Sequence, residues 1–290
     1  MIYGIMIPPA GEHHSRGVHY QHRGFNPVGS NRYSVDQGMD GYHGNYKYKI
    51  IKRIGEGGFG FVEKIELFNT ADHRCGEYAR KSLSDLEPEL RDEFRRRFAR
   101  EVSYQASCVH TNVANIYLCD LKSDQPWFIM DLAAGDLQKD IEKGTLTPFQ
   151  KVDVLMMVAD GLIYLHSLDY LHRDIKPSNI LRFKDGIYKV SDFGLVKNLD
   201  KSSESEVITK IATAMGTAKY MAPEISIAGD YSKRTDIFAF GVLLEDLEML
   251  ENPGIHKVYM KSTARRPPDR YAEVEEMRNE LVAAISGEPK

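Results

Sequence analysis

A short charged stretch between two apolar runs constrains this chain more than any other feature of its sequence. It extends from Tyr170 to Leu181 and reads YLHRDIKPSNIL. Within it, a carboxylate (Asp174), an ammonium group (Lys176) and an amide (Asn179) stand a few residues apart. Such groups can hold a hydroxyl nucleophile, a phosphate and a divalent cation together. The stretch therefore predicts a loop that forms part of a catalytic site.

A glycine-rich stretch occurs earlier in the chain, between two segments whose composition predicts strands. A turn without side chains lets backbone N–H groups approach the phosphates of a nucleotide closely. Taken alone, the pattern is explained equally well by a plain hairpin turn that binds no ligand. The residues concerned are Gly55, Gly57, Gly58, Gly60 and Val62.

The strand and the helix expected next carry a lysine and a glutamate. The strand ends in Ala79 and Lys81, and Glu101 lies in the C-terminal half of the helix. The helix is predicted from an apolar residue at every fourth position, with several arginines on its outer face. The apolar stripe consists of Leu86, Leu90, Phe94, Phe98 and Val102.

In their order and spacing, these motifs resemble those of the eukaryotic-type protein kinase family, Ser/Thr branch. The charged loop is similar to the family pattern H-R-D-L-x-x-x-N, with Ile175 in place of leucine. The glycine stretch matches G-x-G-x-x-G-x-V, and Asp192-Phe193-Gly194 and a closing segment that ends in Ala222-Pro223-Glu224 follow. Lys176 is typical of the Ser/Thr branch.

The resemblance covers about residues 46–286 and implies an α+β fold with two lobes. We expect residues 1–45 to form a flexible extension, because they are rich in Gly, His, Tyr and Pro without an apolar period. Residues 46–132 would form a small lobe with a five-stranded sheet and one main helix. Residues 133–290 would form a larger, mostly helical lobe that lacks one helix after its buried central helix.

The resemblance also implies roles for individual residues. Asp174 would orient the substrate hydroxyl and accept its proton, Lys176 would lie by the γ-phosphate, and Lys81 would pair with Glu101. Magnesium, or manganese in its place, would be held by Asn179 and Asp192. The expected contacts to ATP are Gly55, Gly57, Gly58, Gly60, Val62, Ala79, Lys81, Met130, Asp131, Ala133, Asp136 and Leu181. Among these, the backbone groups of Asp131 and Ala133 would bind adenine, and Asp136 would reach the ribose.

The segment that follows Asp192-Phe193-Gly194 is rich in serine and threonine, as expected of an activation loop. A phosphate on this loop could pair with Arg173, which precedes the catalytic aspartate. We predict autophosphorylation at Thr213, with Thr209 as the second candidate. Two buried structural contacts are also implied, a pair between Glu224 and Arg270 and a bond from Asp236 to the backbone of the catalytic loop.

One residue departs from the family pattern. Four positions after Glu101, an apolar residue usually belongs to a stack behind the active site, but here the residue is Gln105. The stack is therefore either weaker or hydrogen-bonded at this position.

The bulk composition limits the partners. The formal net charge of −4 gives no reason to expect nucleic acid or an anionic membrane. The three cysteines have no metal-ligand spacing and are read as reduced thiols, which favours a cytoplasmic protein. No apolar run is long enough for a transmembrane helix. The partners expected are thus ATP and protein substrates, and the oligomeric state is left open.

Two other functions fit a chain of this kind. A kinase-like binding module without catalysis would normally lack Lys81, Asp174 or Asp192, and all of these are present. A phosphotransferase that acts on small molecules usually lacks the motif at Asp192 and the closing segment at Glu224. Both remain alternatives to an active protein kinase.

Overall fold

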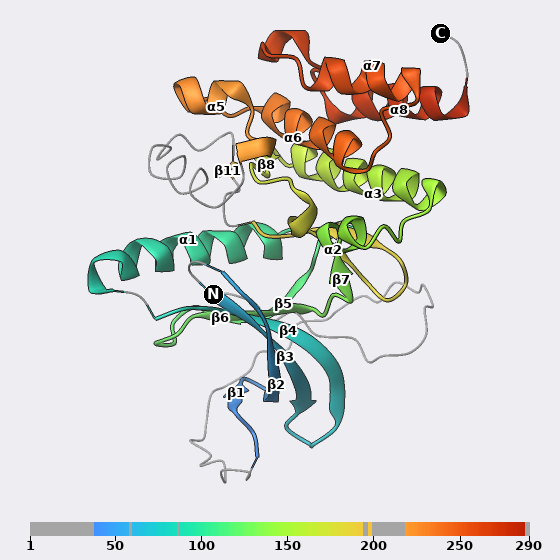
Figure 1. Ribbon diagram of the computed structural model, residues 1–290. Helices are drawn as coiled ribbons and strands as arrows, with labels where there is room; N and C mark the ends of the chain where they lie inside the picture. Colours follow the sequence, from blue (N-terminus) through green and yellow to red (C-terminus); the bar gives the residue numbers. More distant parts are fainter. Residues whose placement is uncertain (1–37, 58–59, 86, 194–196, 199–217, 288–290) are drawn as a thin grey trace, which may run out of the picture.

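The computed structural model describes residues 38–57, 60–85, 87–193, 197–198 and 218–287. They form two lobes, a small one built on a curled sheet and a larger one built mostly of helices (Figure 1). The predicted α+β fold with two lobes is therefore confirmed. The lobe boundaries at residues 45 and 132 stay predictions.

The sheet of the small lobe is antiparallel and has six strands in the order β1-β2-β3-β4-β6-β5. Successive residues of β3 alternate between buried and partly exposed, as expected for strands with one face on a core. The strands are β1 (Gly41–His43), β2 (Tyr46–Glu56), β3 (Gly60–Asn69), β4 (Arg74–Leu83), β5 (Ile116–Asp120) and β6 (Trp127–Asp131).

The sheet has one strand more than the five that we expected. The additional strand is β1, which pairs with β2 although it falls within the stretch predicted as a flexible extension. Gly41 makes this pairing possible, because a Cβ atom at that position would come within 2.2 Å of the Tyr48 ring. A three-residue edge strand is too short to show an apolar period, so β1 could not be predicted from its sequence.

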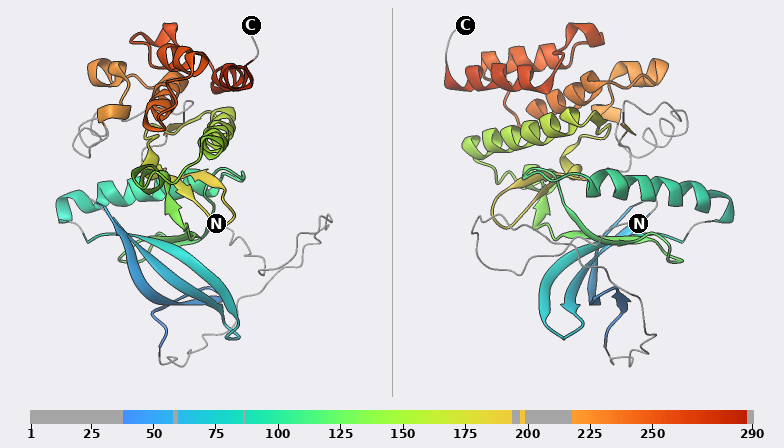
Figure 2. Two further views of the ribbon diagram at one scale, coloured as in Figure 1. Left: turned by 45° about the vertical axis from the view of Figure 1, so that its right-hand side comes forward. Right: turned by 180° about the vertical axis from the view of Figure 1, so that it is seen from behind.

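Helix α1 (Pro88–Ala106) lies across the sheet, between it and the larger lobe (Figures 1 and 2). Phe94, Phe98 and Val102 of the predicted stripe pack with Phe128 in one buried cluster. Leu90 is 44% exposed, in contrast to the prediction, because the first turn of the helix is exposed throughout. Leu86 lies outside the described residues.

The larger lobe contains α3 (Pro148–Ser167), α6 (Lys233–Asp246), α7 (Pro253–Ser262) and α8 (Val274–Ser286), with the shorter helices α2 (Leu137–Glu142) and α5 (Pro223–Ala228). The start of α3 is a capping box in which Thr147 and Gln150 each bond to the other's backbone N–H. Helix α6 is buried along most of its length, which confirms its expected place as the central helix. Between α6 and the C-terminal end of the described part, only α7, α8 and the 3-10 helix η3 (Pro267–Asp269) occur.

Short strands and turns connect the lobes and carry the polar motifs. Strands β7 (Gly135–Asp136), β9 (Ile180–Arg182) and β10 (Tyr188–Val190) form a sheet in the order β10-β9-β7. A second small sheet pairs β8 (Tyr170–Leu171) with β11 (Lys197–Asn198). The 3-10 helices η1 (Pro177–Asn179) and η2 (Ala218–Tyr220) complete the elements. Within the ranges that the structure describes, no helix combines the length and the apolar character needed to cross a membrane.

Candidate active site

The charged loop between β8 and η1 is held in place by a buried carboxylate. Asp236 of α6, which is 1% exposed, accepts hydrogen bonds from the backbone N–H groups of His172 (2.9 Å) and Arg173 (2.8 Å). Its Oδ2 atom also lies 2.8 Å from Nε2 of His166. Burial alone would raise the pKa of Asp236, but these hydrogen bonds outweigh it and lower the pKa below its ordinary value. The loop backbone is thereby held at Arg173 with a φ of 69°, which residues other than glycine rarely adopt.

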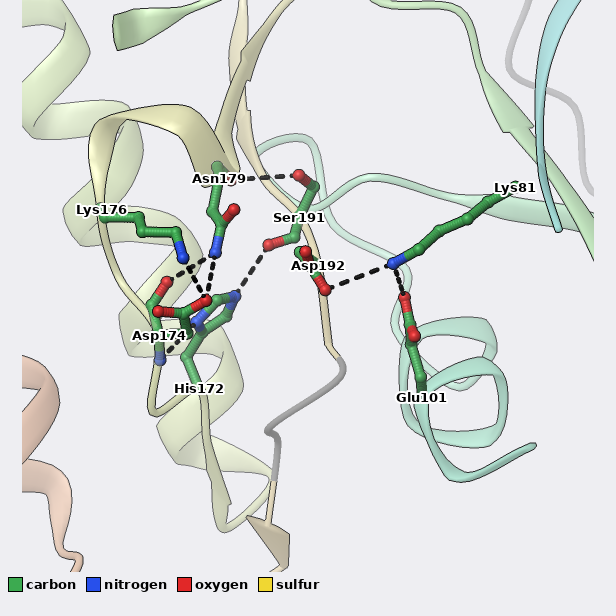
Figure 3. A network of polar contacts seen from close by, with 8 residues as sticks. All are labelled: Lys81, Glu101, His172, Asp174, Lys176, Asn179, Ser191 and Asp192. Carbon is green, nitrogen blue, oxygen red and sulfur yellow. Dashed lines mark hydrogen bonds and ion pairs between the residues drawn. The ribbon is translucent and has the colours of Figure 1, made fainter. Parts of the chain in front are cut away.

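In this loop, one carboxylate oxygen of Asp174 accepts hydrogen bonds and the other accepts none from the described residues. Its Oδ2 atom accepts hydrogen bonds from Lys176 Nζ at 2.8 Å and from Asn179 Nδ2 at 2.9 Å (Figure 3). Its Oδ1 atom has no hydrogen-bond partner among the described residues. The residue is only 8% exposed, so Oδ1 is an acceptor that is both oriented and shielded from bulk water. Such an oxygen can receive a hydrogen bond from a substrate hydroxyl.

Asn179 connects this loop to Asp192. The carbonyl oxygen of Asn179 accepts hydrogen bonds from the backbone N–H (2.9 Å) and the hydroxyl (3.1 Å) of Ser191, the residue before Asp192. Asp192 then turns with a φ of 65°, and Phe193 beside it is buried edge-on against the ring of His172. The two residues expected to hold a metal ion thus come from neighbouring segments that are bonded to each other (Figure 3).

Lys81 reaches the same place from the sheet of the small lobe. Its Nζ atom lies 2.5 Å from Glu101 Oε1 on α1 and 3.4 Å from Asp192 Oδ1 (Figure 3). Burial opposes a charge on Lys81, but the carboxylates of Asp192 and Glu101 prevail and raise the pKa of Lys81 above its ordinary value. The ammonium group therefore stays charged, and the expected ion pair with Glu101 is present. A charged amine at this position can neutralise a phosphate.

Most of the residues expected to contact ATP lie on strands or directly beside them. Val62 pairs with both Gly55 and Lys81 across β2, β3 and β4, and Ala79 pairs with Met130 of β6. Gly57 has no side chain in the turn, and its backbone N–H donates a hydrogen bond to the carbonyl of Gly60 at 2.8 Å. A Cβ atom at Gly60 would come within 2.7 Å of the Ser82 carbonyl oxygen, so glycine is required there for steric reasons as well. Gly58 lies outside the described residues.

Two of the expected contacts have side chains that are already engaged. Asp136 caps α2, accepting hydrogen bonds from the backbone N–H of Lys139 at 2.9 Å and from its Nζ at 2.7 Å. Asp131 accepts from Tyr117 Oη at 2.5 Å and from Lys189 Nζ at 2.9 Å. Their expected roles toward adenine and ribose stay proposals. Asp131 would act through its backbone, and Asp136 would have to share its carboxylate with Lys139.

Other expectations concern regulation and structure. Arg270 donates to both carboxylate oxygens of Glu224, at 2.7 and 2.8 Å, so this buried pair is present. Gln105, 1% exposed, donates from Nε2 to the carbonyl of Ala114 at 2.9 Å, so the stack is hydrogen-bonded at this position. The guanidinium group of Arg173 stacks on the ring of Tyr231, 3.5 Å from the ring centre. Thr209 and Thr213 lie outside the described residues.

The oxygen donors that converge here fit a divalent cation bound together with a nucleotide. Magnesium prefers oxygen ligands and is usually held by one or two carboxylates plus substrate phosphates. Asp192 and Asn179 would supply such oxygens. Among the residues that the structure describes, no cluster of three or more His, Cys, Asp or Glu could hold an ion by itself. The histidines of the N-terminal stretch (His13, His14, His19 and His22) lie outside the described part.

Sequence reasoning missed several residues on which the site depends. His166, which contacts Asp236, and Ser191, which donates to Asn179, were assigned no role from the sequence. Arg182 of β9 and Asp140 of α2, which form an ion pair, belong to no motif. These residues bond across long sequence separations, so no local pattern could have indicated them.

The two-lobed fold, with Lys81 beside Asp192 and with Asp174 in the neighbouring loop, is the arrangement expected of the protein kinase class. The family model of the protein kinase domain matches residues 48–276, so the chain belongs to the protein kinase family. A probable serine/threonine-protein kinase of Clostridium perfringens is 33% identical over 210 residues, which are 69% of this chain and 28% of that protein. Serine/threonine-protein kinase PknD of Protochlamydia amoebophila is 31% identical over 238 residues, covering 71% of this chain and 23% of the relative.

A serine/threonine-protein kinase H1 homolog of Danio rerio is also similar, with 33% identity over 207 residues. The match covers 68% of this chain and 45% of the relative. The chain thus spans less than half the length of each of these relatives. Their names confirm the resemblance to the Ser/Thr branch that the motifs indicated.

Proposed function

We propose that this chain is an active Ser/Thr protein kinase that transfers the γ-phosphate of ATP to hydroxyl groups of proteins. The observation that carries the proposal is the state of Asp174, whose Oδ2 is held by Lys176 and Asn179 while its Oδ1 has no partner among the described residues. A binding module without catalysis has no need for an oriented free acceptor at this place.

The proposed mechanism assigns one task to each group. Asp174 Oδ1 accepts the hydrogen bond of the substrate hydroxyl, orients it for in-line attack and takes up its proton. Lys176, 2.8 Å from Asp174, is positioned to compensate charge on the transferred phosphoryl group. Lys81 neutralises the phosphates that are not transferred. Magnesium, or manganese, supplies further charge neutralisation when it is bound, and Asp192 and Asn179 are the residues that would hold it.

The activity is tested by the transfer of labelled phosphate from ATP, with magnesium, to a generic protein substrate. The matched variant is Lys81→Met, which removes the ammonium group that pairs with Glu101 and Asp192. We expect transfer by the wild type and a loss of about 100- to 1,000-fold in the variant, because a buried group that stabilises charge in the transition state is worth about 2.7–4 kcal/mol. Equal label in the two proteins would refute the proposal and favour a binding module. Label in a small molecule but in no protein would favour the small-molecule phosphotransferase.

We also propose that the chain phosphorylates itself at Thr213, or secondly at Thr209, and that Arg173 receives the phosphate. The support is the position of Arg173, which is next to Asp174 and whose Nε and Nη2 atoms have no hydrogen-bond partner in the described part of the chain. Phosphopeptide mapping after incubation with ATP should detect phosphate at Thr213 or Thr209, and none in the Lys81→Met variant. A map of active protein that lacks both sites would contradict this prediction.

The compartment and the partners belong to the same proposal. Cys75, Cys108 and Cys119 are all free thiols, which supports a reducing environment such as the cytoplasm. The net charge of −4 supports protein substrates rather than nucleic acid as partners.

A further inference from the structure

Two buried side chains, Asp140 and Tyr188, and the partly exposed Arg182 form a bonded group that has no part in the mechanism above. Arg182 of β9 donates from Nε to Asp140 Oδ2 at 2.8 Å and from Nη2 to Asp140 Oδ1 at 3.1 Å. Tyr188 of β10 donates its hydroxyl to Asp140 Oδ2 at 2.8 Å. Asp140 is only 4% exposed, and we call these three residues the Asp140 triad. A two-point contact between arginine and carboxylate sets orientation as well as distance.

The triad keeps Asp140 charged in spite of its burial. Burial alone would raise the pKa of Asp140, but the hydrogen bonds from Arg182 and Tyr188 outweigh it and hold the pKa below its ordinary value. The contact is therefore a permanent ion pair at neutral pH rather than a neutral hydrogen bond.

Arg182 also contacts the segment that is expected to bind adenine. Its carbonyl oxygen accepts the backbone N–H of Ala134 at 2.7 Å, which fixes the chain immediately after Ala133. Its guanidinium group lies against Gly135, where an added Cβ atom would be 3.0 Å from Nη2. One residue therefore holds the connection between the lobes through both its backbone and its side chain.

Two further residues that are expected to contact the nucleotide are linked to the same triad. Leu181 precedes Arg182 on β9 and pairs in register with Asp136 of β7. Asp136 in turn caps α2, the helix on which Asp140 lies one turn later. Three expected contacts thus lie on this side of the nucleotide: Ala133, Leu181 and Asp136. Each is only a few positions along the chain from a residue of the triad or from a residue bonded to it.

From these contacts we infer that the Asp140 triad positions the adenine and ribose side of the nucleotide site, with Arg182 as its central positioning residue. The triad touches no reacting group, so its loss acts on nucleotide binding and leaves the phosphoryl-transfer step largely intact. The inference rests on the proposed function, because it needs a nucleotide at this site.

The test compares Arg182→Met with a matched triad elsewhere in the protein. Arg80 donates to Glu63 Oε2 at 3.1 and 2.6 Å and to Tyr48 Oη at 2.5 Å, and both Arg80 and Glu63 are 9% exposed. Glu63 lies next to Val62 on β3, so the two side chains point to opposite faces of the sheet. Glu63→Gln therefore removes the ion pair of a similar triad, whose arginine is more buried than Arg182, on the face opposite the expected nucleotide contact. It is the control for a loss of stability alone.

Binding of Mg-ATP and Mg-ADP is measured by calorimetry, together with KM for ATP, kcat and the unfolding temperature. Arg182→Met should raise Kd and KM about 10-fold with kcat changed less than about 2-fold, because displaced binding groups weaken positioning. Arg182→Lys keeps the charge but only one contact and should give an intermediate Kd. Tyr188→Phe keeps the ion pair and should change Kd less than about 2-fold. Glu63→Gln should lower the unfolding temperature without a change in Kd.

The outcomes separate this inference from the proposed function. If the wild type binds Mg-ATP and Arg182→Met binds equally well, the inference is overturned and the proposed function stands. If Arg182→Met does not fold, unchanged binding by both Arg182→Lys and Asp140→Asn overturns it. If the wild type itself binds no Mg-ATP, the proposed function fails and the inference fails with it.

Discussion

Replacement of Asp174 by asparagine should lower kcat for phosphoryl transfer by about 100- to 10,000-fold, the range typical of a lost general base. Asparagine has the same shape, and its single carbonyl oxygen can keep the bonds that Lys176 and Asn179 now donate to Oδ2. Its NH2 group then occupies the place of Oδ1, which is the atom without a partner among the described residues. A donor stands where the substrate hydroxyl needs an acceptor, and no group remains to take up the proton.

The binding of Mg-ATP should change much less than kcat in the Asp174→Asn variant, by about 3-fold or less, because the loop keeps its hydrogen bonds. Labelled-phosphate transfer and calorimetry measure the two quantities separately. The matched control is Asp169→Asn, an exposed residue with a φ of 58° that asparagine also tolerates, and it should leave kcat unchanged. A kcat for Asp174→Asn within about 5-fold of the wild type would contradict the assignment of Asp174 as the base.

Replacement of Asp236 by alanine should lower the free energy of unfolding by about 3–5 kcal/mol, out of the 5–15 kcal/mol typical of a native protein. The substitution leaves the N–H groups of His172 and Arg173 and the ring of His166 without their common acceptor inside the protein. Each unsatisfied buried group costs about 1–3 kcal/mol. The loop that carries Asp174 would lose its support, so transfer activity should fall as well.

Urea unfolding measures this change. Asp160→Asn is the control, since Asp160 pairs with Arg278 at 2.9 Å in a contact that is 42% and 33% exposed, and such pairs contribute less than about 1 kcal/mol. Equal loss of stability in the two variants would contradict the buried role of Asp236.

The pH dependence of stability offers an additional readout on Asp236. Because its pKa is lower in the folded protein, its contribution is present above the unfolded pKa of about 4 and is lost as the pH falls through the folded value. The difference in stability between the wild type and Asp236→Asn should therefore shrink in acid.

The strand that leads into Asp192 connects more of the site than its length suggests. Five consecutive residues, from Tyr188 to Asp192, each bond to a different segment of the chain. Their partners are, in order, Asp140, Asp131, Asn112, Asn179 and Lys81. Lys189 and Asp192 bond to strands of the small lobe, while Tyr188 and Ser191 bond within the larger lobe. These five residues therefore connect the two lobes across the site.

Much of the site was visible in local patterns. The residue types at Asp174, Lys176 and Asn179, with their spacing, predicted a catalytic loop. The resemblance to the protein kinase family then implied that Lys81 and Asp192 belong to the same site. Such signals can be read from the sequence because a loop or a helix start depends mainly on residues a few positions apart. The same resemblance also implied the two lobes.

Tertiary structure alone decided which residues support these groups. Asp140 meets Arg182 and Tyr188 from α2, β9 and β10, and the side chains of Asp131 and Asp136 turned out to be bonded within the protein. The short strand β1 likewise exists because β2 offers it an edge and Gly41 fits against Tyr48. Contacts of this kind depend on the relative placement of distant segments. Packing and chain entropy determine that placement over the whole fold, and no local run of residues encodes it.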